Sequence, residues 1–418
     1  MFPSRQHLIL LWTFLVLPSF VLASSGDRNP TFQHCLKGCK VTYCDPSQPP
    51  VPIWLRGLGW TCEDDCKYSC SHSFTDNIRP GSRYHQFYGK WVFYRLGPIQ
   101  EPFSVIMSLG NLWVNLRGLQ EIIRRVRKEN KLRRWLEGMA WVQINTWFWS
   151  SVFHCRDTPL TERLDYFSAT LTIASSLLYT IIRIFHLQTP LQTSRTILPL
   201  IILFTCLILG HFTYLLSFPI GSFPYGYHTH FALSLGLLHH LLWSLFSLSF
   251  FLKFPSFTLL SKKISWPRPY LSRDPLERPL PHDALTPVIL VGLTLLSMSL
   301  ELLDFAPFFR MVDAHSLWHA ATIPLMMGWW SFLCGDAIEL EGSQMQARGI
   351  NIGSEKMPLT GNSNLGNGGL NGGVGAGGMT ETPRLQNFTQ LAAHTDYTRS
   401  KSISPGRSPQ REKGQHPE

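Results

Sequence analysis

The chain has 418 residues, of which 44% are hydrophobic and only 15% are charged, and its formal net charge is +10. Soluble globular proteins carry about 25% charged residues, so this composition argues against a soluble protein and indicates a membrane protein. In membrane proteins a positive balance is typical of basic cytosolic loops, and we do not expect nucleic acid as a partner.

The first 23 residues have the three parts of a secretory signal peptide. Arg5 supplies the positive charge, residues 8–17 are apolar, and small residues around Ala23 and Ser24 offer a cleavage site. The alternative is an uncleaved anchor helix. With a signal peptide at 1–23, we expect the segment 24–101 to lie in the lumen of the secretory pathway.

This luminal segment contains six of the nine cysteines of the chain, all within 36 residues. Behind a signal peptide such a density predicts up to three disulfides, with 15 possible pairings. The alternative is zinc binding by the CxxxC spacings. Cysteines in or beside apolar runs are expected to be free, namely Cys155, Cys206 and Cys334. The disulfide candidates are Cys35, Cys39, Cys44, Cys62, Cys66 and Cys70.

Apolar runs recur from residue 102 onward and predict an all-α membrane protein with a seven-transmembrane helix bundle over residues 102–337. A helix needs roughly 20 apolar residues to cross a bilayer. The first run is short and contains Asn111 and Asn115, so it fits this length least well. The predicted spans are 102–116, 136–153, 167–186, 197–217, 229–252, 284–303 and 315–335.

Basic residues predict the orientation of these spans. The connections 117–134 and 253–283 are rich in Lys and Arg, which favours the cytosolic side. The connections 154–166, 218–228 and 304–314 then face the lumen, in agreement with the signal peptide. The tail, residues 338–418, is predicted to be cytosolic and disordered, because its Gly/Asn-rich and basic stretches cannot form a core. The glycosylation sequon at Asn387 is therefore expected to be unmodified.

Polar side chains gather at the predicted luminal ends of three spans. Ser150 and His154 are four residues apart and share a helix face, as do His315 and His319. Asp165 begins the third span at the same membrane depth. Ionisable groups inside membrane spans are costly and are functional candidates. If the three helices are neighbours, the five side chains converge on one point.

Such a set fits hydrolysis. Three imidazoles can hold zinc and leave a position for water, whose pKa the zinc lowers to around 7. A carboxylate can take the proton of this water, and a hydroxyl can donate to a developing oxyanion. The simpler alternatives are that the histidines meet lipid headgroups, that Ser150 bonds its own backbone and that Asp165 caps its helix.

Other polar residues near the same boundary are treated as secondary candidates for packing, surface or substrate contacts. They are His211, His228, His230, His239, His240, Asp157, Glu162, Asp304 and Asp313.

Three segments closely resemble the Per-like proteins, which are GPI-anchor lipid-remodelling factors of the post-GPI-attachment-to-proteins type. The segments are "YHQFYGKWVFYRLGPIQEPFSVIMSLGNLWVN" (84–115), "NTWFWSSVFHCRDTPLTERLDYF" (145–167) and "DAHSLWHAATIP" (313–324). These proteins belong to the CREST superfamily of seven-span membrane hydrolases. The resemblance covers roughly residues 30–337.

The resemblance implies a site and an activity. The superfamily pattern of a Ser four residues before a His, an Asp eleven after it and a later HxxxH falls on the five residues above. It implies zinc held by His154, His315 and His319, with Asp165 acting on the water and Ser150 on the oxyanion.

The implied reaction removes the sn-2 acyl chain of the GPI phosphatidylinositol, giving a lyso-GPI, in the membrane of the endoplasmic reticulum or the Golgi. GPI-anchored proteins and membrane lipids are the implied partners. The alternatives are a non-catalytic receptor or escort for GPI-anchored cargo, a ceramidase-like amidase and an ion transporter.

Overall fold

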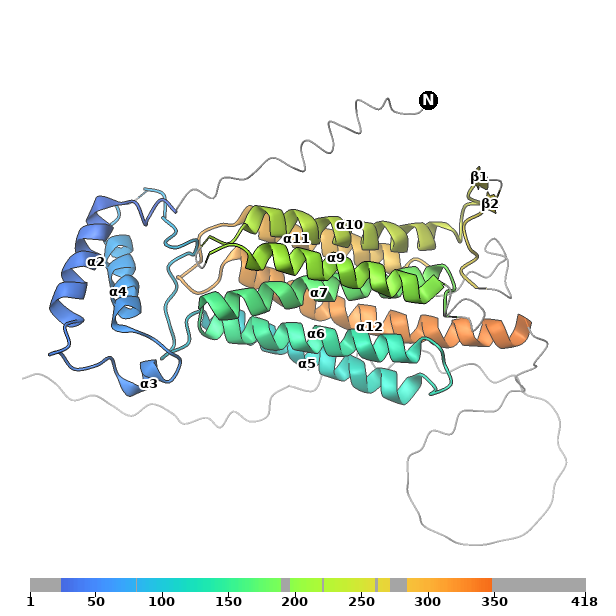
Figure 1. Cartoon of the computed structure of the whole chain (residues 1–418), viewed down its shortest axis with the longest axis horizontal. Coiled ribbons are helices and arrows are strands. Elements are labelled where there is room, and N and C mark those ends of the chain that lie inside the picture. Colours follow the sequence, from blue (N-terminus) through green and yellow to red (C-terminus); the bar gives the residue numbers. More distant parts are fainter. Residues whose placement is uncertain are drawn as a thin grey trace, which may run out of the picture. The chain divides into compact units, whose positions relative to one another are not determined.

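The computed structural model describes residues 24–79, 81–188, 196–219, 222–259, 262–270 and 284–347. The predicted signal peptide at 1–23, most of the predicted tail and the sequon at Asn387 lie outside these residues. Within them the protein is mostly helical, as predicted (Figure 1). The one departure from an all-α fold is a short antiparallel hairpin of β1 (Phe257–Leu259) and β2 (Lys262–Ile264).

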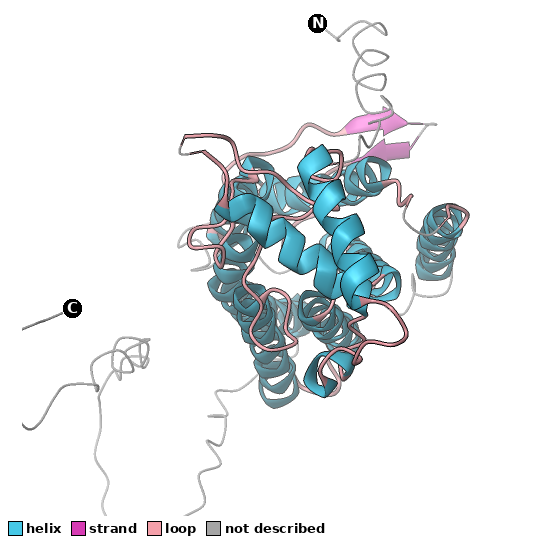
Figure 2. Cartoon of the chain, turned by 90° about the vertical axis from the view of Figure 1, so that its left-hand side faces the viewer, coloured by secondary structure: helices cyan, strands magenta, loops and turns pink. Residues whose placement is uncertain are grey.

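A small cysteine-rich domain contains α2 (Pro30–Tyr43), α3 (Ile53–Arg56) and α4 (Cys62–Asp76). The Asn29 side chain caps α2, and Thr61 and Asp64 form a reciprocal capping box at the start of α4. Figure 2 views the molecule from the side of this domain. Local capping signals thus fix where both long helices begin.

Three nested disulfides join α2 to α4, as the six clustered cysteines predicted. The pairs are Cys35–Cys70, Cys39–Cys66 and Cys44–Cys62, and the three remaining cysteines are free. Cys44, Cys62 and Cys66 lie close enough to share an ion. As disulfide sulfurs, however, they lack the thiolates that zinc requires, so the alternative of a zinc site here is wrong.

Seven helices follow in the described part of the chain, one at each predicted span. Prolines at the first or second position favour the starts of four of them, α5, α7, α9 and α11. The seven helices are α5 (Pro102–Arg125), α6 (Arg133–Cys155), α7 (Pro159–Ile184), α9 (Leu198–Leu216), α10 (Tyr225–Leu248), α11 (Thr286–Leu303) and α12 (Ala314–Ala347).

Six of these helices pack in a closed ring, in the order α5, α6, α7, α10, α11, α12 and back to α5. The seventh, α9, packs mainly against α7. Figures 1 and 2 show the helices running side by side along one direction. This ring brings the start of α12 next to α5 and α6, which are far from it in the sequence.

By length and composition, α7, α9 and α10 are able to cross a membrane, and the part of α11 at Thr286–Glu301 is a shorter apolar helix. The apolar surface of α9 is largely exposed, since Leu198, Ile202 and Leu203 each have more than half of their surface accessible. Exposed aliphatic side chains on α9 are favourable when the helix is surrounded by lipid. Together with the membrane-spanning helices, they indicate a membrane protein.

Two predicted boundaries need correction. Helix α12 continues to Ala347, so residues 338–347, assigned to the disordered tail, are helical. Helix α7 begins at Pro159 because Thr158 and Thr161 form a capping box, so the predicted connection 154–166 is much shorter. Both differences arise because polar residues extend a helix when its ends are capped or packed.

Asn111 and Asn115, the polar residues within the first predicted span, form hydrogen bonds that join α5 to α12. The Asn111 amide donates to the carbonyl of His319 at 2.7 Å, and the Trp330 indole donates to Asn115 Oδ1 at 3.0 Å. Gly118 lies so close to Trp330 that an added Cβ would stand 2.4 Å from the indole ring. Helix α5 is therefore held against α12 by buried hydrogen bonds and a close backbone approach.

Candidate metal and hydrolytic site

Three histidines meet where α6 ends and α12 begins. The ring centroids are 5.3 Å apart for His154 and His315, 5.1 Å for His154 and His319, and 4.4 Å for His315 and His319. One nitrogen from each lies within 4.8 Å of the others. His154 and His319 are buried, while His315 is partly exposed. The two helices that carry the histidines, α6 and α12, thus meet at this end of the ring, as the sequence pattern required.

Each imidazole is held through Nδ1 by a different side chain. His154 Nδ1 contacts Glu101 Oε2 at 2.7 Å, His315 Nδ1 contacts Glu301 Oε2 at 2.6 Å, and His319 Nδ1 contacts Ser108 Oγ at 3.0 Å. A metal-binding histidine commonly donates its second N–H to a carboxylate or similar acceptor. The three contacts leave Nε2 as the common ligand atom.

The residues present fit a zinc ion. His154 Nε2 is buried and has no hydrogen-bond partner among the described residues, which is costly unless something binds it. Three imidazoles with one shared open face are the donor set of many catalytic zinc sites. The group therefore has the chemistry, the spacing and the unsatisfied atom expected of a metal site.

The other two predicted residues lie beside the histidines. Ser150 is buried one turn before His154, and its Oγ is 3.2 Å from Ser108 Oγ. Asp165 lies on α7, close enough to His154 and His315 for their charges to interact with its carboxylate. No described residue makes a hydrogen bond to that carboxylate, so it remains available for a proton. All five predicted side chains are therefore gathered in one place.

A partly buried lysine, Lys90, supports the carboxylate that holds His154. Lys90 Nζ is 2.6 Å from Glu101 Oε1 and 3.1 Å from Asp157 Oδ2. Burial alone would lower the pKa of Lys90, but the two carboxylates hold it above its ordinary range. Burial alone would likewise raise the pKa of Glu101, which Lys90 and His154 keep low. Glu101 therefore presents a charged carboxylate to His154.

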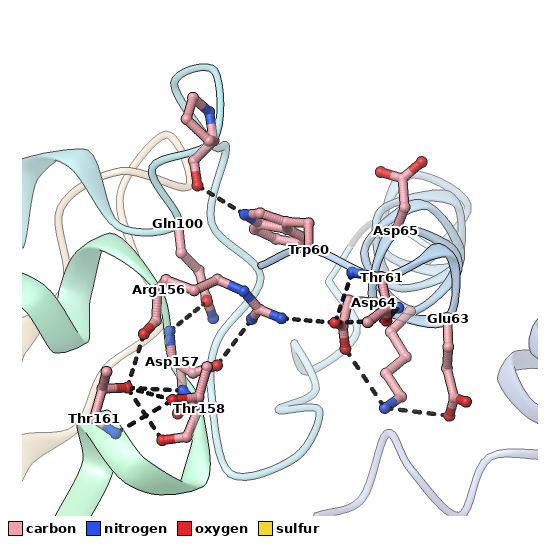
Figure 3. A network of polar contacts seen from close by, with 12 residues as sticks. Trp60, Thr61, Glu63, Asp64, Asp65, Gln100, Arg156, Asp157, Thr158 and Thr161 are labelled. Atoms are coloured by element: carbon pink, nitrogen blue, oxygen red, sulfur yellow. Dashed lines mark hydrogen bonds and ion pairs between the residues drawn. The ribbon is translucent and has the colours of Figure 1, made fainter. Parts of the chain in front are cut away.

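The cysteine-rich domain is tied to the same end of the ring. Arg156, directly after α6, donates to Asp64 Oδ2 at 2.6 Å, and its guanidinium lies 4.5 Å from the centroid of the Trp60 ring (Figure 3). The backbone N–H of Asp157 donates to Gln100 Oε1 at 3.1 Å. The backbone N–H groups of Gln100 and Glu101 donate to the carbonyls of Cys155 and His154 at the end of α6. These contacts fix the turn that follows His154.

The secondary candidates lie elsewhere or act structurally. His211 Nε2 and His228 Nδ1 are 3.3 Å apart and form a separate pair. His239 Nδ1 contacts Thr180 Oγ1. Asp313 caps α12 by accepting from the backbone N–H of Ser316. The remaining contacts are those of His230 with the carbonyl of Gly226, Asp157 with Lys90, and Asp304 with Gln86 and Trp91.

Sequence reasoning missed Glu101, Ser108 and Glu301. None stands at a helical spacing from the histidine that it holds: Glu101 and His154 are 53 residues apart, and Ser108 and His319 are 211 apart. A signal was nevertheless present for Ser108 and Glu301, which are polar groups inside apolar runs and hence functional candidates.

The chain is similar to a known family over most of its length. The Per1-like family matches residues 52–337. Among curated proteins, a mouse protein named "GPI-specific phospholipase A2-like PGAP3" is 35% identical over 344 residues, covering 81% of this chain and 96% of the relative. The human protein of the same name is 33% identical, covering 76% and 90%.

A more distant organism gives the same result. The "Protein PER1 homolog" of Schizosaccharomyces pombe is 32% identical over 326 residues, covering 76% of this chain and 88% of the relative. No solved structure matches the chain significantly. The described histidines and their neighbours from Glu101 to His319 all fall inside the matched region.

Proposed function

The chain belongs to the Per1-like family, and on this premise we propose that it remodels GPI anchors as an acyl hydrolase of the phospholipase A2 type. It hydrolyses the sn-2 acyl ester of the GPI phosphatidylinositol and releases a lyso-GPI and a fatty acid. Its relatives carry the words "GPI-specific phospholipase A2-like" in their names. The substrates are GPI-anchored proteins together with the membrane lipid that anchors them.

The observation that carries this proposal is the histidine site with all three Nδ1 atoms engaged. Through Nε2, His154, His315 and His319 would hold a zinc ion. Zinc held by three imidazoles supplies a Lewis acid that activates water and polarises an ester carbonyl. The surrounding side chains fix the imidazole rings and the directions of their protons.

The hydrogen-bond chain beside His319 gives Ser150 its role. An imidazole that ligates through Nε2 carries its proton on Nδ1, and this N–H donates to Ser108 Oγ. The Ser108 hydroxyl then donates to Ser150 Oγ at 3.2 Å. The Ser150 hydroxyl proton is left free to donate to the ester oxygen as negative charge develops there.

Asp165 moves the proton of the reaction. Its carboxylate takes a proton from the attacking water, whose oxygen bonds to the acyl carbon. When the bond between that carbon and the sn-2 oxygen breaks, the same proton passes to the departing oxygen. The absence of hydrogen bonds to this carboxylate from the described residues supports such a role.

The proposed arrangement in the membrane is a seven-span bundle over 102–337, with the signal peptide at 1–23 removed. The cysteine-rich domain at 24–101 and the histidine site face the lumen of the endoplasmic reticulum or Golgi, and residues from 338 onward face the cytosol. The acyl chain remains in the hydrocarbon while its ester, near the headgroups, reaches the site.

The test is zinc content and lyso-GPI production measured on the same purified variants. His154→Ala, His315→Ala and His319→Ala should each lose both metal and activity, because two ligands hold zinc poorly. Asp165→Asn should keep the metal and lose turnover. Ser150→Ala should keep the metal and lower kcat on the order of 10²-fold, as expected for one oxyanion donor.

Three other outcomes would point elsewhere. Histidine variants with full zinc and full activity would place the site elsewhere, and the pair His211 and His228 would be the next residues to substitute. Wild-type protein that binds GPI-anchored cargo without producing lyso-GPI would indicate a receptor or escort. Cleavage of ceramide in place of GPI would indicate an amidase.

A further inference from the structure

A cavity of 510 Å³ lies between the cysteine-rich domain and the loop that joins α11 to α12. Its volume is in the range of small-ligand sites, about 300–1,000 Å³. One wall is the strand-like segment that follows α4, and the other is the loop at 304–313. The lining is mainly aromatic with a few polar groups, and includes Tyr84, His85, Trp91, Tyr94, Phe309 and Arg310.

Several of these rings are unusually open to solvent. Tyr84 is 52% exposed, Tyr94 is 47% exposed and Phe309 is 90% exposed. Several exposed aromatic rings that line one cavity, as these three do, form the kind of apolar patch that marks a binding surface. The described residues therefore leave aromatic faces free at the mouth of this cavity.

The loop holds these rings at a conformational cost. Phe309 and Arg310 have φ of 53° and 56°, and Asp304 has φ of 35°. Side chains other than Gly, Asn and Asp rarely adopt this left-handed region, and such strain gathers at functional sites. Glycine would adopt this backbone conformation with less strain. Two consecutive bulky residues at these positions therefore indicate that their side chains have a function that outweighs the strain.

Contacts with the cysteine-rich domain hold the strained loop in place. Arg310 Nη2 donates to Asp76 Oδ1 at 2.6 Å, and the Tyr94 backbone N–H donates to the Arg310 carbonyl at 2.9 Å. The Trp91 indole donates to Asp304 Oδ1 at 2.8 Å. Both walls of the cavity are thus fixed to each other before any ligand binds.

The same loop leads directly to the histidine site. It begins after Glu301, which holds His315, and ends at α12, where His315 lies in the first turn. Phe309 is six residues before His315, so they are at most about 20 Å apart. A ligand in the cavity can therefore belong to the same molecule as an ester at the histidines.

We propose that this cavity binds the glycan of the GPI anchor, an inference that rests on the proposed function. Sugar rings have an apolar face that stacks on aromatic rings and hydroxyls at the edge that bond to polar groups. The rings of Tyr84, Trp91 and Phe309 supply the first kind of surface, and the hydroxyls of Tyr84 and Tyr94 with His85 supply the second.

An acyl chain suits this lining less well. It would cover the tyrosine hydroxyls, the imidazole and the guanidinium without replacing their hydrogen bonds to water, which is unfavourable. The cavity also lies outside the helix ring. It therefore serves as the headgroup subsite, and acyl recognition belongs to the helices.

The direct test is calorimetric titration of the full-length protein in detergent with the water-soluble inositol-phosphate glycan of a GPI, freed of its acylglycerol. The wild type should bind it. Phe309→Ala and Tyr84→Ala should each raise Kd about tenfold, as expected for loss of one stacked ring. Tyr43→Ala, which removes a ring that is 64% exposed on α2 and does not line the cavity, should leave Kd unchanged.

The outcomes separate this inference from the proposed function. No glycan binding by the wild type, or binding by Phe309→Ala equal to that of the wild type, overturns the glycan subsite even if the protein hydrolyses GPI. Glycan binding without hydrolysis supports the subsite and contradicts the hydrolase. Because Phe309 is 90% exposed, its removal leaves no cavity in a core.

Steady-state kinetics provide a second, independent test of the glycan subsite. Phe309→Ala should raise KM for a protein-free GPI glycolipid about tenfold with little change in kcat, since a ring far from the ester contributes uniform binding. Hydrolysis of phosphatidylinositol, which has the same lipid without the glycan, should be unaffected. If Phe309→Ala raised KM equally for the GPI glycolipid and for phosphatidylinositol, the result would contradict glycan recognition by this cavity.

Discussion

At the scale of single residues, the three histidines differ in what supports them. Glu101 holds His154 and is itself held by Lys90, whereas Glu301 holds His315 in a partly exposed setting. A hydroxyl holds His319. Carboxylates increase the basicity of an imidazole ligand more than a hydroxyl does. The two carboxylate-supported histidines should therefore contribute most to metal affinity.

Glu301→Ala should weaken zinc binding about 10–100-fold, the usual effect of removing such a support. Glu301→Gln, which keeps an acceptor oxygen but loses the charge, should fall between this variant and the wild type. Competition with a chromogenic chelator measures the affinity directly. Glu121→Gln is the matched control, because Glu121 has a partly exposed carboxylate whose only ion pair among the described residues is with Arg124. Unchanged affinity in Glu301→Ala would exclude the supporting role.

Single residues of the sequence predict part of the candidate site. Ser150 with His154 and His315 with His319 are visible because a helix repeats every four residues on one face. Their supports come from other elements, and only the closed ring of helices brings them near. The cysteine count predicted three disulfides, but the nested pairing depends on how α2 lies against α4. The aromatic cavity joins segments more than 200 residues apart, such as Tyr84 and Phe309.

At the scale of elements, the contact between α5 and α12 positions both Ser108 and His319. Gly118→Ala should destabilise the protein by about 1–3 kcal/mol, because the new Cβ would stand 2.4 Å from Trp330. Gly138→Ala in α6 is the control, since nothing lies within 4 Å of its added Cβ. There the substitution should stabilise by about 0.4–1 kcal/mol. Thermal unfolding in detergent measures the stability of both variants. Equal midpoint temperatures for Gly118→Ala and Gly138→Ala would contradict the close approach of Gly118 to Trp330.

At the scale of the whole described molecule, His72 joins the cysteine-rich domain to the last loop. Its Nε2 is 3.0 Å from the Phe93 carbonyl and its Nδ1 is 3.1 Å from Arg310 Nη1. Only a neutral imidazole with the proton on Nε2 satisfies both contacts. Burial, followed by the charges of Arg310 and Arg95, lowers the pKa of His72, against a smaller opposing effect of the Phe93 carbonyl and Asp76.

This depressed pKa predicts that the loop loosens in acid. Above a pH of about 6.5, the ordinary histidine value, the undocked imidazole is neutral and the contact is fully present. As the pH falls below that value the undocked form binds a proton that the docked form excludes, so docking is progressively lost. Hydrogen exchange of residues 305–312 at pH 7.5 and 5 measures this.

The control for this prediction is His72→Gln, whose amide can donate to the Phe93 carbonyl and accept from Arg310 at every pH. The variant should show little change in exchange between the two pH values. If the wild type and His72→Gln respond equally, other groups are responsible for any loosening.

The nested disulfides also dictate an order of assembly. Cys35–Cys70 encloses Cys39–Cys66, which encloses Cys44–Cys62, and the core around them uses residues no later than Val92. Synthesis proceeds from the N-terminus, so this domain can be complete before α5, which starts at Pro102, has been made. Arg310 and Phe309 are added only after α11. The aromatic cavity can therefore form only after α11 has been made, and the histidine site, which needs His315 and His319 of α12, is completed later still.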